Sequence, residues 1–260
     1  MKLKQEQTVG VIGGLGPKAT LDFYAKLLER TEASNDQDHL QVIINSNPKV
    51  PNRQSSLDGT GPSCAPHLID SAQALKRAGA DFLVMVCNTA HAYENDIRQA
   101  IDLPFISIIN ESVNACLRKN PSLKKVGLLA TDGCLNASLY QKCFAEHGVE
   151  CITPDTFDQA KLMNLIFRIK ANDRDLAIEF EMEHLAQTLI DEGAEIILAA
   201  CTEVPLVLQD SFITAPLISS TDVLVDAVLA YAKVGSTYLA YPESKDLANQ
   251  IFQPFPYISA

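Results

Sequence analysis

The chain has 260 residues, and its 21 Lys and Arg against 32 Asp and Glu leave a formal net charge of −11. This acidic balance argues against a nucleic-acid or anionic-membrane surface, since both need a basic patch. A hydrophobic fraction of 47% excludes wholesale disorder, and the length allows one large domain or two small ones.

The N-terminus carries no recognisable secretory signal. A polar start precedes the apolar residues 9–12, a run too short for a signal peptide or a membrane span. No two of the seven cysteines are separated by only two residues, which disfavours a zinc knuckle or a thioredoxin-type pair. Free thiols fit a reducing compartment, so we expect a cytoplasmic protein.

The first predicted strand, residues 9–12, runs into a glycine-rich turn at residues 13–16, with Pro17 at the start of a helix. Residues 14–19 fit the dinucleotide pattern G-x-G-x-x-A, which requires an acidic residue at the end of the next strand. That strand, expected at 41–44, is followed by Asn45 and Ser46. We therefore interpret the glycines as a tight turn and expect no nucleotide cofactor.

The second half of the chain repeats the first. Residues 72–81 (AQALKRAGAD) match residues 186–195 (AQTLIDEGAE), and the same register continues without a gap to Cys87 and Cys201. Residues 103–107 match residues 215–219 in the same way. A repeat of this length indicates two copies of one structural unit.

Each copy alternates short apolar runs with amphipathic stretches such as residues 67–78. This alternation predicts an α/β fold with two pseudo-symmetric domains, each a parallel β-sheet flanked by helices. Ligands of such sheets bind beyond the carboxyl ends of the strands, which predicts an active site in the interdomain cleft.

We expect the first domain to comprise residues 1–113 and 213–235 and the second to comprise residues 114–212. In this division the strand at 217–219 and the helix at 222–232 return to complete the first half. Residues 236–260 lie outside the repeat as a C-terminal tail.

Cys87 and Cys201 occupy equivalent positions, each at the carboxyl end of a predicted strand and just before a predicted helix. A helix N-terminus lowers the pKa of a thiol, because its dipole favours negative charge. Two thiols flanking one carbon can act as a base on one face and an acid on the other. The remaining cysteines fit a packing role: Cys64, Cys116, Cys134, Cys143 and Cys151.

The two cysteine motifs resemble those of the aspartate/glutamate racemase family. Residues 86–91 (VCNTAH) look like its first motif, and residues 201–206 (CTEVPL) look like its second motif in the aspartate-racemase form. The resemblance runs from about residue 9 to about residue 232.

This resemblance implies an amino-acid racemase that needs neither pyridoxal phosphate nor a metal and uses Cys87 and Cys201 as its acid/base pair. Aspartate is the expected substrate, with glutamate or a wider set of amino acids as the alternative. The resemblance also implies a homodimer. The substrate-binding residues carried over from the family are Asn88, Thr89, Thr131, Thr202 and Glu203, together with Arg53 and Lys170 as cations for an acidic side chain of the substrate.

Two other interpretations of the same residues stay open. A decarboxylase or isomerase of the same superfamily would commonly use one of the two cysteine positions. A catalytically silent protein that binds an amino acid or dicarboxylate would need neither thiol. His91, one turn beyond Cys87, fits a structural histidine better than a group that tunes the thiol.

Overall fold

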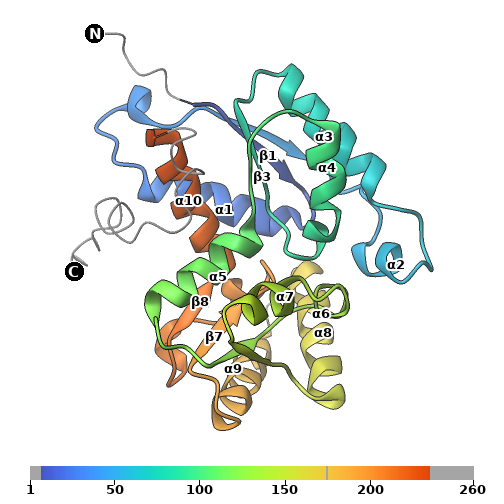
Figure 1. Cartoon of the computed structure of the whole chain (residues 1–260), viewed down its shortest axis with the longest axis vertical. Helices are drawn as coiled ribbons and strands as arrows, with labels where there is room; N and C mark the ends of the chain where they lie inside the picture. Colours follow the sequence, from blue (N-terminus) through green and yellow to red (C-terminus); the bar gives the residue numbers. More distant parts are fainter. Residues whose placement is uncertain (1–6, 174, 235–260) are drawn as a thin grey trace.

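The computed structural model describes residues 7–173 and 175–234, which form two parallel four-stranded sheets with helices around them (Figure 1). The strands of the first sheet are β1 (Val9–Gly13), β2 (Val42–Ser46), β3 (Phe82–Met85) and β4 (Phe105–Ile106). The strands of the second sheet are β5 (Lys125–Leu128), β6 (Glu150–Ile152), β7 (Ile196–Ala199) and β8 (Leu217–Ser219).

The two sheets have the same topology. Their strand orders are β2-β1-β3-β4 and β6-β5-β7-β8, so each strand of the first sheet has a counterpart in the second. All pairings are parallel, and each crossover therefore needs an intervening helix or loop. The predicted α/β fold with two repeated halves is confirmed.

Helices supply the layers on both sides of each sheet. In the first half they are α1 (Pro17–Arg30), α2 (Arg53–Leu57), α3 (Ala65–Arg77), α4 (Glu94–Ala100) and α5 (Ile108–Lys119). In the second half they are α6 (Asp132–Asn136), α7 (Leu139–Glu146), α8 (Thr156–Lys170) and α9 (Ala177–Asp191), followed by α10 (Ser220–Val234). In the described chain no helix is both long and apolar enough to cross a membrane.

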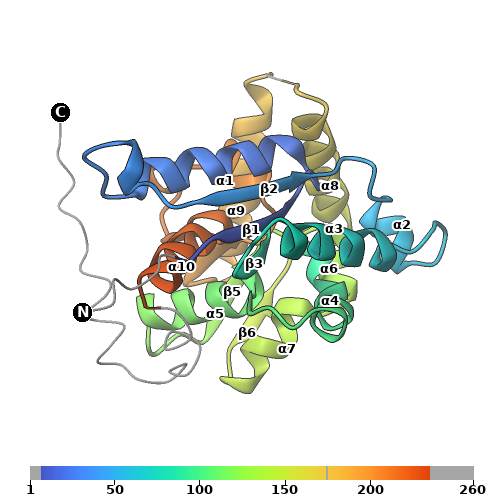
Figure 2. The same cartoon turned by 90° about the horizontal axis from the view of Figure 1, so that it is seen from above.

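Alternate residues of the central strands enter different hydrophobic cores. Phe82 and Val84 of β3 join a core that includes residues of α1, α5 and α10, whereas Leu83 and Met85 face a core with α3 and α4. Figure 2 shows α1 and α3 on opposite sides of the first sheet. Burial on both faces explains why these strands read as continuous apolar runs.

One core connects the two halves. It contains strand residues of both sheets, such as Val84 of β3 and Leu198 of β7, together with helices α5, α7 and α10. A separate core packs α8 and α9 against the other face of the second sheet, where Ile197 and Ala199 point. The two halves are therefore held face to face by shared apolar contacts.

The strand at residues 217–219, expected to complete the first half, belongs to the second sheet instead. β8 pairs with β7 in the second sheet, with Leu217 opposite Ile197 and Ser219 opposite Ala199. The physical reason is the repeat itself, because β8 takes the edge position that β4 holds in the first sheet. The helix that follows, α10, does return and packs against α1 and α5.

The other expected boundaries stay a prediction. The division between residues 113 and 114 falls inside α5, which is one continuous helix. The tail at residues 236–260 lies outside the described residues.

A cluster of ion pairs joins α10 to α1. Asp222 Oδ2 lies 3.0 Å from Lys26 Nζ, its other carboxylate oxygen contacts Arg30, and Arg30 Nη1 lies 2.8 Å from Asp226 Oδ1. Burial by itself would raise the pKa of Asp222, but its hydrogen bond with Ser219 and the charges of Arg30 and Lys26 lower it overall. Asp222 is therefore ionised at neutral pH and pairs with both cations.

We predict that Asp222→Asn lowers the free energy of unfolding at pH 7 by about 1–2 kcal/mol, since it removes half-buried ion pairs. A carboxylate with a depressed pKa in the folded state contributes its full stabilisation above the pKa of the unfolded chain, about 4, and loses it as the pH falls from there through the lower folded-state pKa. The deficit should therefore shrink on acidification toward pH 3. Urea unfolding across this range measures it, with the exposed Asp70→Asn as the control; an equal loss in both variants at pH 7 contradicts the prediction.

Candidate active site

Cys87 and Cys201 lie at equivalent places in the two halves. Each is two residues beyond the end of its strand, β3 or β7, and their exposed fractions are 8% and 5%. The segments that follow are short 3₁₀ helices, Thr89–Tyr93 and Val204–Leu206, whereas the sequence predicted that a longer helix begins at each cysteine. The dipole argument for an activated thiol is correspondingly weaker.

For Cys201 the expected lowering of the thiol pKa is wrong. Burial raises the pKa of Cys201 well above its usual value, the neighbouring Glu203 carboxylate raises it further, and Lys170 opposes them. The thiol sulfur lies 3.2 Å from Glu203 Oε2, to which it donates a hydrogen bond. Burial and the carboxylate therefore both favour the protonated form of the Cys201 thiol.

Arg53 and Lys170, the two predicted cations, come from different halves and meet at one backbone oxygen. Arg53 Nη2 lies 2.6 Å from Leu15 O, and Lys170 Nζ lies 3.5 Å from the same atom. Arg53 also donates to Pro51 O at 2.9 Å. The turn that contains Leu15 thus joins the cations of both halves.

Both cysteines lie near the ammonium group of Lys170. Burial would lower the pKa of its ammonium, but Glu203, Cys201 and Cys87 act in the opposite direction and the pKa is raised overall. Both thiols are therefore close enough for their charge to reach the same ammonium group. Lys170 Nζ lies 2.6 Å from Glu203 Oε1, which is its ion-pair partner.

The glycine turn at residues 13–16 is shaped by close contacts. Gly14 has φ = 81°, and a Cβ there would lie 2.3 Å from the backbone nitrogen of Asn47. A Cβ on Gly16 would lie 2.3 Å from Glu203 Oε1. Residue 14 must be glycine because its backbone has a positive φ. Residue 16 must be glycine because a Cβ there would collide with the Glu203 carboxylate. The interpretation as a tight turn before α1 is confirmed.

Two hydrogen bonds cross between the halves beside the cysteines. The hydroxyls of Thr89 and Thr131 are 2.7 Å apart, and the backbone N–H of Gly133 donates to Gln54 Oε1. Thr89 and Thr131 are both 5% exposed. The predicted residues Thr89 and Thr131 are thus brought together from opposite halves.

Asn88 is engaged in a buried chain of hydrogen bonds. Tyr140 donates its hydroxyl proton to Asn88 Oδ1, and Asn88 Nδ2 donates to Ser220 Oγ at 3.0 Å. Ser220 Oγ in turn donates to Ala199 O at 2.8 Å. The chain runs from the residue after Cys87 to the last residue of β7, so it links the two strand ends that carry the cysteines.

Tyr140, Ser220 and Gln54 were not predicted from the sequence. Ser220 had a usable signal, because it directly follows a predicted strand, where parallel sheets place functional groups. Tyr140 and Gln54 belong to no sequence pattern that names their partners. Their roles depend on contacts between the halves.

His91 is a structural histidine. The backbone N–H of Ile108 donates to Nε2 at 3.2 Å, so Nδ1 carries the proton and donates to Cys87 O at 2.8 Å. Burial lowers the pKa of His91, which favours this neutral form. The imidazole ring therefore hydrogen-bonds to the backbone of Cys87 and not to its thiol.

The remaining cysteines are neutral thiols. Burial raises the pKa of Cys116 and of Cys151 to about 12, and it also raises the pKa of Cys64, Cys134 and Cys143. Their unreactive form agrees with the predicted packing role.

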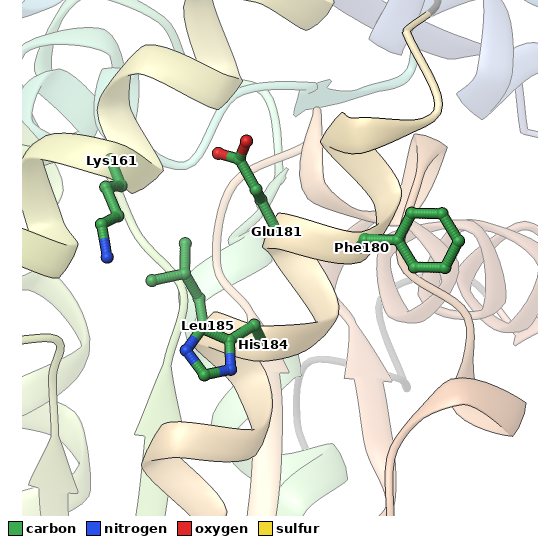
Figure 3. Close-up of a pocket in the computed structure, with 5 residues that line it drawn as sticks. All are labelled: Lys161, Phe180, Glu181, His184 and Leu185. Carbon is green, nitrogen blue, oxygen red and sulfur yellow. The ribbon is translucent and has the colours of Figure 1, made fainter.

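A pocket of about 420 Å³ lies between α8 and α9, and no cysteine lines it (Figure 3). It is lined by Lys161 of α8 and by residues of α9: Phe180, Glu181, His184 and Leu185. In the described part of the chain, no group of three or more His, Cys, Asp or Glu side chains is arranged to hold a metal ion.

The fold and the matched cysteines define a duplicated α/β protein with a buried thiol just beyond the equivalent strand of each half. The chain belongs to the Asp/Glu/Hydantoin racemase family, whose family model matches residues 12–228. The predicted family resemblance is confirmed.

Particular relatives share nearly the whole chain. The broad specificity amino-acid racemase RacX of Bacillus subtilis is 34% identical over 243 residues, which cover 90% of this chain and 99% of RacX. The aspartate racemase structure of Picrophilus torridus is 26% identical with a TM-score of 0.78, covering 91% of this chain and all of that one. Glutamate racemase RacE1 of Bacillus anthracis shares the fold, with a TM-score of 0.66 at 16% sequence identity. The match covers 89% of this chain and 83% of RacE1.

We predict that Tyr140→Phe lowers the free energy of unfolding by about 1–3 kcal/mol, because it leaves Asn88 Oδ1 buried without a donor. Tyr24→Phe, at a partly buried tyrosine of α1, is the matched control and should cost less. Urea unfolding of both variants tests this, and equal losses would show that the hydroxyl of Tyr140 is not needed for stability.

Proposed function

We propose that this protein is an amino-acid racemase that inverts the Cα of aspartate by proton transfer between Cys87 and Cys201. The observation that carries the proposal is the pair of buried thiols at equivalent strand ends, both within electrostatic reach of Lys170. In each direction a thiolate takes the Cα proton from one face while the opposite thiol gives its proton to the other face. After one turnover the sulfur that acted as the base carries the proton, and the sulfur that acted as the acid is a thiolate.

The negative charge that develops beside the substrate α-carboxylate needs donors already in place. We assign this role to Asn88, Thr89, Thr131 and Thr202. Thr89 and Thr131 would exchange their mutual hydrogen bond for contacts with the α-carboxylate. This exchange would let the substrate enter where the two halves now touch.

Arg53 and Lys170 are suited to the second carboxylate of an acidic substrate. They approach Leu15 O from opposite halves, and Arg53 offers a planar fork that matches a carboxylate. Because the chain carries a net charge of −11, these local cations must outweigh long-range repulsion of a dicarboxylate. The second candidate is a broader substrate range, which the similarity to RacX favours.

We expect Cys87→Ser and Cys201→Ser each to reduce racemisation of aspartate by at least about 10²-fold, because a positioned acid or base contributes roughly 10²–10⁴. Chiral chromatography without added pyridoxal phosphate measures the rate in both directions. Cys143→Ser, at a half-buried thiol of α7, is the control and should keep full activity. Full activity of either site variant would refute the two-base mechanism.

The substrate range is tested with a panel of single L-amino acids in ²H₂O. We predict that aspartate gains deuterium at Cα and racemises faster than the other members of the panel. If neutral amino acids racemise as fast as aspartate, the enzyme has a broad substrate range and is not specific for aspartate. Absence of both exchange and racemisation across the panel would support the silent binding protein.

A further inference from the structure

Glu203 is the one acidic residue of the described chain that is buried as a whole, with 2% of its surface exposed. Both of its carboxylate oxygens are engaged. Oε1 accepts from Lys170 Nζ at 2.6 Å, and Oε2 accepts from the Cys201 thiol at 3.2 Å and from the Thr202 hydroxyl at 3.3 Å. A buried carboxylate is tolerated only with such partners, so these contacts define where it sits.

The carboxylate is also confined sterically. The space beside Oε1 is available because residue 16 is glycine, whose missing Cβ would lie 2.3 Å away. Lys170 reaches the same oxygen from α8 in the second half, while Gly16 belongs to the first half. Glu203 is therefore held between both halves, directly beside the thiol.

A thiol beside a fixed carboxylate keeps its proton. The charged groups that act on Cys201 are Glu203 from its own segment and Lys170 from α8. Lys170 is already paired with Glu203 Oε1, so a thiolate at Cys201 would face the second carboxylate oxygen at 3.2 Å. Repulsion between two like charges at that distance disfavours the thiolate.

Cys87 has different neighbours. Its charge acts on Lys170 and on the thiols of Cys64 and Cys134, which burial keeps neutral. In the described chain no carboxylate accepts a hydrogen bond from its sulfur, and His91 hydrogen-bonds to its backbone oxygen. Arg53 and Lys170 carry two positive charges, and Glu203 carries one negative charge. One thiolate, at Cys87, therefore brings the net charge of these four side chains to zero.

We propose that Glu203 is a positioning residue that keeps Cys201 as the proton donor of the ligand-free enzyme and leaves Cys87 as its base. This inference rests on the proposed racemase function and makes the pseudo-symmetric site chemically asymmetric. The free enzyme is then ready for the enantiomer whose Cα proton faces Cys87. The opposite enantiomer requires a proton to move from Cys201 to Cys87 first.

The asymmetry has to be measured on the thiols themselves. The two enantiomers have equal free energy in water, so kcat/KM must be the same for both whatever the protonation state of the free enzyme. Iodoacetamide alkylates thiolates, and mass spectrometry of peptides reports Cys87 and Cys201 separately. The pH at which each alkylation rate reaches half its maximum is independent of how accessible the sulfur is.

In the wild-type full chain without ligand, we expect the midpoint of Cys87 to lie at least one pH unit below that of Cys201. A midpoint for Cys201 equal to or below that of Cys87 overturns the proposal. This measurement needs no variant, so it stays decisive if a substitution at Glu203 prevents folding.

Glu203→Gln keeps the shape and an acceptor but removes the charge, and it also frees the charge of Lys170. Both changes favour the thiolate, so the Cys201 midpoint and the alkaline limb of kcat/KM should move down by about one pH unit or more. Glu192→Gln, at an exposed position after α9, should move neither. An unmoved midpoint in Glu203→Gln overturns the inference even if the wild type racemises aspartate, whereas the expected midpoints without any racemisation overturn the proposed function instead.

Discussion

The structure depends on one constraint, the burial of parallel strands on both faces. A parallel strand covered by helices can expose functional groups only where its chain leaves the sheet, at the carboxyl end. β3 and β7 obey this constraint in the two sheets, and each is followed two residues later by a buried cysteine. Because a single core holds the two halves face to face, both strand ends arrive at the same junction.

Buried polar groups at this junction then determine how closely the halves fit. Tyr140, Asn88 and Ser220 form a hydrogen-bonded chain that ends on the backbone of β7, and each member is buried. In a water-poor interior an unpaired group would be costly, so the chain favours one relative placement of the two halves. The distance between the two strand ends is thereby restrained by groups that carry no charge.

Charge does not follow the symmetry of the fold. The backbone repeats, but the residue two positions after Cys201 is Glu203, whereas the residue two positions after Cys87 is Thr89. One buried carboxylate is enough to give the two sulfurs different environments, since electrostatic interactions are strong where water is excluded. A duplicated architecture can in this way support two chemically different partners, which an acid and a base must be.

The sequence by itself determined the fold class, the repeat, the family and the positions of the paired cysteines. These depend on local patterns, namely apolar run length and motif spacing, which survive without knowledge of any contact. The pairing of β8 with β7 was missed, although its match to residues 103–107 pointed to it. Only the tertiary structure decided what each side chain touches: Glu203 between Cys201 and Lys170, Asn88 on Tyr140, and Arg53 beside Lys170 at Leu15 O. The raised pKa of Cys201 follows from those contacts and from burial, both of which join residues far apart in the chain.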